Sequence, residues 1–413
     1  MNKLGQEIRS IKGPTFLNWS KEVGKMHWRN NIVANRGKIF FGTSGNEWNQ
    51  PDSEDAIWCV DAATGSQLWR CEMHADVNEV SLIGNFVVAG TDGGEVAAID
   101  QDSGEKIAVL ELDGPIFAKP IEINHQNQNV GVIISHAGNV IIFDPGKREF
   151  LEFGETSHNV RANPVTTDDL ASKGTFVVGT EENEVIVCRL TGNSIEKKAI
   201  YNLGISKSSF GKFQLKNTGI QSLVISGKSI LVSFTRDTYD KRPPLICLDL
   251  MTGEFKWQAR TAKTISKKDA VVGNCRIRPV VWKNLVISTF SYSGSLHAFD
   301  INTGLGKWRI TLDAGFFQNW SSPLLSGDYL YVPRINGVIS KIDLVSQNIL
   351  ETASVETANS PSPATSLGRY EARDGEEAYP NQRIERGLCS SPTMVDGAII
   401  VGTASGNLLS LSL

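Results

Sequence analysis

A short turn motif that recurs with fixed internal spacing is the feature of this sequence that most constrains its fold. In three segments an Asp is followed by a Thr-Gly pair and then by a Trp, at 61–69, 249–257 and 300–308. Four more segments keep part of this frame, at 100–104 without the Trp, 144–146 in shortened form, 190–192 without the Asp and 343–346 without the Gly. Apolar strands separated by polar turns precede each copy. Such repetition predicts a series of small four-stranded sheets.

The two ends of the chain complement each other. An eighth repeat begins at Ser391 and stops at Leu413 after its third strand, whereas 16–20 reads as an outermost strand with no repeat before it. Pairing the ends would supply the missing strand and remove exposed sheet edges. We therefore predict an all-β fold, a single closed β-propeller over residues 1–413 with eight four-stranded blades, the last completed by the N-terminal strand. A seven-bladed propeller is the alternative.

The residues of the motif have physical roles in packing. The Gly provides the positive φ angle that a tight hairpin needs, while the Asp and Thr bond backbone groups of the turn. The Trp then falls on the outer strand, where its ring can cover the gap between neighbouring blades while its N–H finds a partner. We interpret the repeated tryptophans as packing residues.

This repeat resembles that of the quinoprotein-like family, whose eight-bladed propellers include pyrroloquinoline-quinone dehydrogenases and outer-membrane assembly lipoproteins. The resemblance covers nearly the whole chain and implies the fold, but it leaves open whether the protein is an enzyme or a binding scaffold. The enzyme branch is marked by two adjacent cysteines, a Trp floor for the quinone and Glu, Asn and Asp ligands for calcium. No two of the six cysteines here are adjacent. We therefore expect no quinone cofactor and no enzymatic activity.

Neither the cysteines nor the histidines show the spacing of a metal site. Cys59, Cys188 and Cys247 each lie two residues before the turn, where other copies have Ala98 and Ala298. A small side chain in a tight space between sheets explains all five, so we expect reduced, packed thiols. The six histidines form no HxH or HxxxH pair, and no metal is expected.

Charge and hydropathy exclude several classes of partner and location. The net charge of −4, from 41 basic and 45 acidic residues, gives no overall attraction to nucleic acid or to an anionic membrane. No apolar run approaches the roughly 18–20 residues of a membrane span. The first 20 residues mix charged with isolated apolar residues and lack the apolar core of an export signal. We predict a cytoplasmic protein without a membrane partner.

Loop lengths distinguish the two faces of the predicted propeller. Turns between the first and second and between the third and fourth strands of each blade are short. The opposite face carries the insertions, at 44–56, 204–221, 235–245, 261–276 and 356–388. Long loops on a rigid scaffold often carry recognition, so this is the predicted functional face, although solvent loops without function are the alternative. The polar segment 356–388, between the last two blades, is expected to be mobile.

Charge also divides along this face. Early loops hold the acidic residues Glu47, Asp52, Glu54, Asp55, Asp92, Glu95, Glu181, Glu182 and Glu184. Later loops hold a basic sector interleaved with aromatic residues: Lys207, Phe210, Lys212, Phe213, Arg236, Tyr239, Lys241, Arg242, Lys263, Lys267, Lys268, Arg276 and Arg278. Such a mixture serves protein anchoring or base stacking, and we predict that the basic sector binds the partner.

These observations predict a non-catalytic recognition scaffold that binds another protein through the loop-rich face. One alternative is a reader of nucleic acid or phosphorylated ligands that uses the basic sector, for which binding would depend strongly on salt. A second alternative is a small-molecule or enzymatic site, including a quinone-dependent one, in the central channel.

Overall fold

The computed structural model describes residues 17–27, 29–45, 51–156, 158–203, 219–235, 244–260, 275, 277–290, 295–312, 321–334, 337–354 and 387–412. The chain divides into two compact units. The N-terminal unit is Lys21–Ile205, and the C-terminal unit combines Ser206–Leu413 with Met1–Ser20. Of the predicted insertion at 356–388, only the last two residues lie within the described part of the chain.

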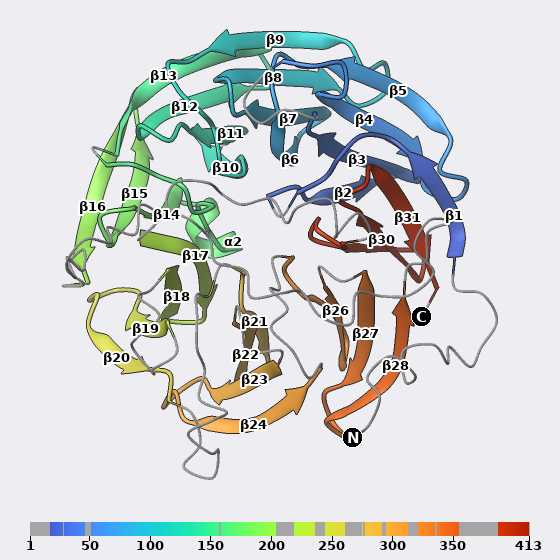
Figure 1. Ribbon diagram of the computed structural model, residues 1–413. Coiled ribbons are helices and arrows are strands. Elements are labelled where there is room, and N and C mark those ends of the chain that lie inside the picture. The colour runs from blue at the N-terminus through green and yellow to red at the C-terminus, as the bar shows by residue number, and fades with distance from the viewer. Residues whose placement is uncertain are drawn as a thin grey trace, which may run out of the picture. The chain divides into compact units, whose positions relative to one another are not determined.

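Four sheets make up the N-terminal unit, each with its strands in sequence order and antiparallel (Figure 1). The first contains β2 (Ile32–Asn35), β3 (Lys38–Thr43), β4 (Ala56–Asp61) and β5 (Gln67–Glu72). The second contains β6 (Val77–Ile83), β7 (Phe86–Thr91), β8 (Glu95–Asp100) and β9 (Lys106–Glu111). The third contains β10 (Ile121–His125), β11 (Gln128–Ile134), β12 (Asn139–Asp144) and β13 (Glu149–Glu155).

The fourth sheet of this unit departs from the repeat. It has three strands, β14 (Thr175–Gly179), β15 (Glu184–Thr191) and β16 (Ser194–Asn202). In place of an innermost strand, two isolated bridges join Val160 to Thr180 and Val165 to Val177, and the short helix α2 (Asp168–Ala171) follows them. Within the described residues, no helix has the length and apolar character that a membrane span requires.

The C-terminal unit contains four sheets of four strands. The first contains β17 (Gly219–Ser226), β18 (Ser229–Thr235), β19 (Leu245–Asp249) and β20 (Phe255–Gln258). The second contains β21 (Val280–Trp282), β22 (Leu285–Thr289), β23 (Ser295–Asp300) and β24 (Gly306–Thr311). The third contains β25 (Leu324–Ser326), β26 (Tyr329–Pro333), β27 (Val338–Asp343) and β28 (Asn348–Ser354).

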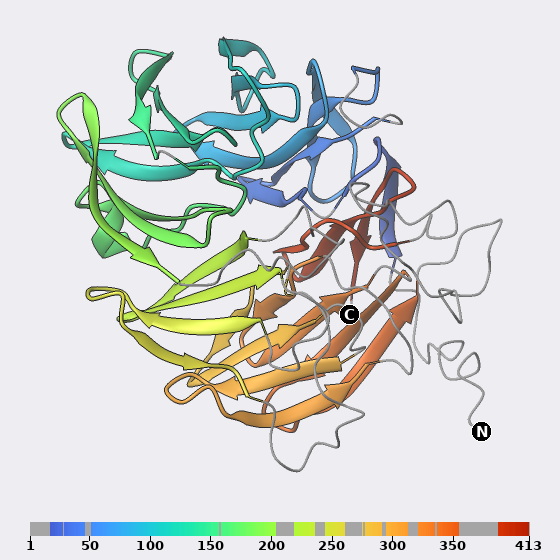
Figure 2. The same cartoon turned by 60° about the vertical axis from the view of Figure 1, so that its left-hand side comes forward.

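The last sheet joins the two ends of the chain, as predicted. β29 (Thr393–Val395), β30 (Ala398–Gly402) and β31 (Asn407–Leu411) are completed by β1 (Leu17–Glu22), which lies beside β31 in Figures 1 and 2. Asn18 Nδ2 donates to Ser410 Oγ at 3.2 Å, and Ser412 Oγ donates to Asn18 Oδ1 at 2.9 Å. With eight sheets and almost no helix, the predicted all-β, eight-bladed propeller class is confirmed, although the described part of one blade has three strands rather than four.

Many strands are apolar along nearly their whole length because most sheets are covered on both faces. β4, β7 and β8 are buried along nearly their whole length, which favours continuous Val, Ile, Ala and Phe rather than alternation. Phe40, Trp69 and Val80 belong to one core between the first and second sheets. Each sheet therefore owes its stability to its neighbours rather than to a core of its own.

The Asp turns share one geometry. In five copies the N–H of the residue four positions after the Asp donates to the Asp carbonyl, at 2.8–3.0 Å. The copy at 144 was predicted to be shortened, and this was wrong: Arg148 occupies the Gly position with φ +59° and donates to Asp144 O at 2.8 Å. The Pro-Gly pair inside the turn, which resembles a two-residue turn, caused the error.

The Trp and the Gly of the motif pack together across neighbouring sheets. Trp69 Nε1 donates to Gln101 O in the next sheet at 3.0 Å, and a Cβ on Gly104 would lie 2.7 Å from its ring. Trp257 repeats this arrangement, with a bond to Ile301 O at 2.8 Å and Gly304 against its ring. The prediction that Trp covers the gap between blades is confirmed, and the Gly is required for this contact as well as for its φ angle.

All six cysteines are free and buried, as the packing interpretation predicts. Cys59 faces Phe40 and Trp69 on the neighbouring strands of its sheet, and burial raises its pKa to about 12. Burial likewise raises the pKa of Cys188 to about 12. These thiols are protonated at neutral pH and are poor nucleophiles.

Candidate functional site

The strand order gives every sheet two distinct ends. Connections between the second and third strands and links to the next sheet leave at one end, here called the loop end. Connections between the first and second and between the third and fourth strands leave at the other, here called the turn end. The predicted functional face corresponds to the loop ends.

The predicted basic sector falls almost wholly outside the described residues. Only Arg278 is described; it is exposed, and its backbone N–H donates to Ser322 Oγ at 3.1 Å. The other members lie outside the described part of the chain: Lys207, Phe210, Lys212, Phe213, Arg236, Tyr239, Lys241, Arg242, Lys263, Lys267, Lys268 and Arg276. The basic sector therefore stays a prediction.

The predicted acidic surface is partly wrong. Asp55, Asp92 and Glu95 are buried, with exposures of 0%, 7% and 1%. Glu181 and Glu184 are half-buried and face His136 and His158, respectively. Glu47 lies outside the described residues. Most of the described carboxylates in this set take part in internal contacts instead of forming an open acidic surface.

A buried ion pair joins the loop ends of the first two sheets. Arg29, just before β2, donates from Nη2 to Asp92 Oδ2 at 2.9 Å and from Nε to Asn78 Oδ1 at 2.8 Å. Asn78 Nδ2 in turn donates to Asp92 Oδ1 at 2.6 Å. All three side chains are buried. A buried charge is tolerated when it is both paired and hydrogen-bonded, as here.

Phe117 extends this contact to the third and fourth sheets. The Arg29 guanidinium lies 4.8 Å from the ring centroid, and the Arg161 guanidinium lies 4.4 Å from it. The His136 ring approaches edge-on, with centroids 5.1 Å apart. Cation–π attraction strengthens as the groups are removed from water, and the Phe117 ring is buried. One aromatic ring therefore fixes two arginines from different sheets.

The network ends at Glu181, in the link between β14 and β15. Arg161 Nε donates to Glu181 Oε1 at 3.0 Å, and His136 Nε2 lies 3.3 Å from Oε2. Partial burial raises the pKa of Glu181, but the adjacent His136 imidazole and the Arg161 charge outweigh it and the net shift is downward. We name Arg29, Asn78, Asp92, Phe117, His136, Arg161 and Glu181 the loop-end network.

Two further buried carboxylates adjoin the network. Gly45 N donates to Asp76 Oδ1 at 3.1 Å, and Asp52 N donates to Asp55 Oδ2 at 3.0 Å. Burial raises the pKa of Asp76 to about 7, and the nearby Asp92 and Asp55 charges add to the effect. The pKa of Asp55 is also raised, mainly by burial. At neutral pH this region is sensitive to protonation.

Of the loop-end network, the sequence indicated Asp92 and Glu181 as acidic loop residues and missed the other five members. Arg29, Phe117 and Arg161 share a signal that could have found them: each is a large residue in the link that enters the innermost position of a sheet. The side chains of Arg161, Glu181 and His136 keep exposures of 16%, 19% and 24%, so their edges face solvent. Charged groups held in place before binding suit recognition, because little entropy is lost when a ligand docks.

The fold and this network define the chain as a repeat propeller with a preorganised polar surface at its loop ends. Residues 10–199 and 214–353 match the family described as outer membrane protein assembly factor BamB, and the chain belongs to that family. An assembly factor BamB of Shewanella oneidensis is 21% identical over 397 residues, covering 82% of this chain and 92% of that protein.

Solved structures show the same fold at low identity. BamB of Moraxella catarrhalis has a TM-score of 0.63 at 14% identity, covering 96% of this chain and 100% of that one. Saccharomyces cerevisiae Sqt1 has a TM-score of 0.65 at 9% identity, covering 97% and 100%. The computationally designed protein Ika8 has a TM-score of 0.60 at 14% identity, covering 95% and 99%. These likenesses concern the fold alone.

Proposed function

We propose that this chain is a non-catalytic scaffold that binds a protein partner through the loop ends of its sheets. The observation that carries the proposal is the loop-end network, in which Arg29 and Phe117 fix the partly exposed Arg161, His136 and Glu181 before any partner arrives. Its family and a relative in that family are named outer membrane protein assembly factors, which supports a scaffold that binds proteins.

Paired residues at the turn ends suit structure rather than recognition. Lys283 Nζ lies 3.2 Å from Asp328 Oδ1, which also accepts from Trp282 Nε1 at 2.9 Å. Lys283 in addition lies 4.1 Å from the Trp282 ring centroid. These contacts join two neighbouring sheets and provide a matched control for the loop ends.

The test is affinity capture with the tagged full chain, followed by binding of the identified partner in purified form. A variant with Arg161→Gln, His136→Gln and Glu181→Gln removes the exposed charge of the network but keeps polar side chains of similar size. The control exchanges the turn-end charges, Lys283→Asp with Asp328→Lys, which keeps their ion pair. We expect at least about tenfold weaker binding for the first variant alone. An equal loss of partner affinity in both variants, or a loss of affinity only in the control, would contradict the proposal.

Two related predictions need separate measurements. Binding of nucleic acid through the basic sector would show a steep fall in affinity between low and physiological salt, which a fluorescence titration with a labelled oligonucleotide measures.

The cytoplasmic location also stays a prediction. The BamB relatives are named for the assembly of outer membrane proteins, so fractionation of the source cells is the direct check of where this chain is located.

A further inference from the structure

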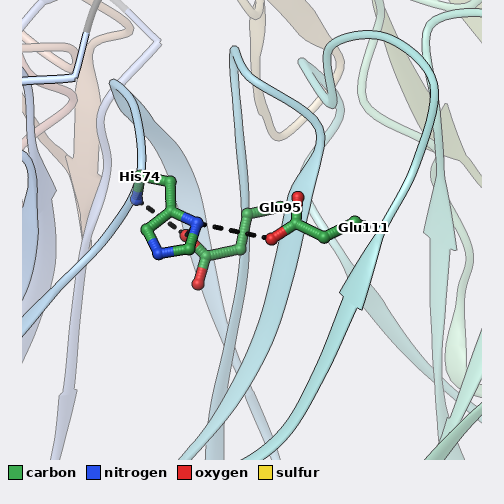
Figure 3. Close-up of side chains that lie close together, drawn as sticks. All are labelled: His74, Glu95 and Glu111. Carbon is green, nitrogen blue, oxygen red and sulfur yellow. Dashed lines mark hydrogen bonds and ion pairs between the residues drawn. The ribbon is translucent and has the colours of Figure 1, made fainter.

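A histidine and two glutamates meet at the loop end of the second sheet, outside the loop-end network. His74 lies in the link between β5 and β6, Glu95 begins β8 and Glu111 ends β9, and Figure 3 shows their three side chains close together. His74 Nδ1 lies 3.4 Å from Glu111 Oε1 and 3.9 Å from Glu95 Oε2. One donor atom from each residue can be chosen so that all three lie within 4.8 Å of one another.

The fold forces the two carboxylates together. Glu95 and Glu111 are direct partners in the antiparallel register of β8 and β9, a placement that is unfavourable for like charges. Lys106 Nζ lies 2.6 Å from Glu95 Oε1 and balances one of the two charges. Within the described residues, His74 is the ionisable partner of Glu111. A cation at this position would relieve the remaining repulsion.

The donor atoms match the needs of a zinc-like ion. Zinc binds imidazole nitrogen and carboxylate oxygen at about 2.0–2.2 Å, which puts neighbouring donors of a tetrahedron roughly 3.3 Å apart. The distances from His74 Nδ1 to the two carboxylates are 3.4 and 3.9 Å, so a small adjustment of the exposed side chains suffices. Harder ions such as magnesium and calcium prefer oxygen donors alone.

One ligand is anchored and two are accessible. Glu95 is 1% exposed, and its Oε2 accepts from the His74 backbone N–H at 2.7 Å, while Lys106 holds Oε1. Such neighbours orient a metal ligand. The side chains of His74 and Glu111 are 72% and 58% exposed, which leaves a path for the ion and room for water. The Lys106 ammonium weakens attraction for a cation, so a moderate affinity is expected.

We propose that His74, Glu95 and Glu111 bind a divalent transition-metal ion of the zinc type in an open site, with water completing the coordination. The site does not depend on the proposed scaffold function, because none of its three ligands belongs to the loop-end network. Its occupancy would tie the link before β6 to the ends of β8 and β9.

The test is calorimetric titration of the metal-stripped full chain with zinc chloride, with His74→Ala and Glu111→Gln as variants. Both positions are exposed, so these variants should fold like the parent, and circular dichroism checks this. Glu72→Gln is the matched control, because Glu72 is an exposed neighbour that pairs with Arg70. We expect one zinc per chain in the parent and the control, and at least about tenfold weaker binding in both variants.

Cobalt(II) provides a second readout of the same site. Bound cobalt should show the visible absorption of nitrogen and oxygen ligation without a thiolate charge-transfer band, because the six cysteines are buried. The proposal is overturned by no zinc binding in the parent, by equal affinity in parent and variants, or by a thiolate band.

Discussion

The turn ends and the loop ends of the N-terminal unit use polar residues in opposite ways. At the turn ends, the Asp61 and Asp100 carboxylates accept from backbone N–H groups two or three residues further along the chain, and the arrangement repeats from sheet to sheet. At the loop ends, Arg29 and Asp92 are 63 residues apart in sequence and have no repeated counterpart in the motif. Repeated polar positions therefore build the sheets, whereas unrepeated ones connect them and shape the candidate binding surface.

Copies that deviate from the turn motif show what its glycine does. The second sheet has Ala108 where the first has Trp69, and the turn of the third sheet accordingly has Arg148 in place of Gly. A positive φ angle alone does not demand Gly at this position. The close approach of a Trp from the preceding sheet does.

The largest expected effect is at the loop ends. Replacing Arg29 with Met leaves Asp92 buried without its charged partner, which should cost about 3–5 kcal/mol of unfolding free energy. Chemical denaturation of the full chain measures the loss. The matched control is Lys173→Met, because the Lys173–Asp169 pair is exposed and should contribute about 0.5 kcal/mol or less. Comparable losses in the two variants would show that the buried pair does not organise the loop ends.

At the turn ends, two glycines separate the effect of backbone angle from that of packing. Gly304 and Gly327 have φ angles of +69° and +59°, but a Cβ on Gly304 would lie 2.5 Å from Trp257, whereas one on Gly327 meets nothing within 4 Å. Gly327→Ala should therefore cost about 1 kcal/mol for the left-handed backbone alone. Gly304→Ala should cost about 2–4 kcal/mol, because the Trp must also move. Equal losses, compared by denaturation midpoint, would mean that the Trp–Gly contact is unimportant.

The fold could be predicted because its motif repeats along the chain. The candidate site could not, because its residues have no repeated counterparts. Eight sheets, the shared last sheet and the buried thiols follow from spacing that recurs along one chain. The fourth sheet was harder, because 159–167 lacks the apolar run of an innermost strand and contains Pro164. Contacts such as Phe117 with Arg29 and Arg161 depend on how separate sheets pack, and neither local propensity nor periodicity contains that information.

The repeated strands are mostly apolar, but β23 contains a buried titratable residue, His297. It is 2% exposed, packs near Phe290 and Phe299, and has its pKa lowered to about 3 by burial, with a smaller contribution from Arg309. The unfolded chain then binds a proton near pH 6.5 that the folded chain rejects, so stability falls as the pH decreases from 6.5 towards 3. His297→Leu should remove this loss and be about 2–3 kcal/mol more stable than the parent at pH 4.5. A parent and variant with parallel stability curves between pH 7 and 4.5 would contradict the prediction.

Asp76 should show the opposite pH dependence at the loop ends. Its pKa is raised to about 7, so the folded chain holds a proton that the unfolded chain releases near pH 4, and stability from this group falls as the pH rises from 4 through 7. Asp76→Asn keeps the oxygen that accepts from Gly45 N but cannot ionise. The gain of the variant over the parent should be about 2–3 kcal/mol larger at pH 8 than at pH 5, as measured by denaturation at both values. A gain that is equal at the two pH values would indicate that the Asp76 carboxylate is already ionised at pH 5. Of the two groups, only His297 would then make the stability of the folded chain depend on pH.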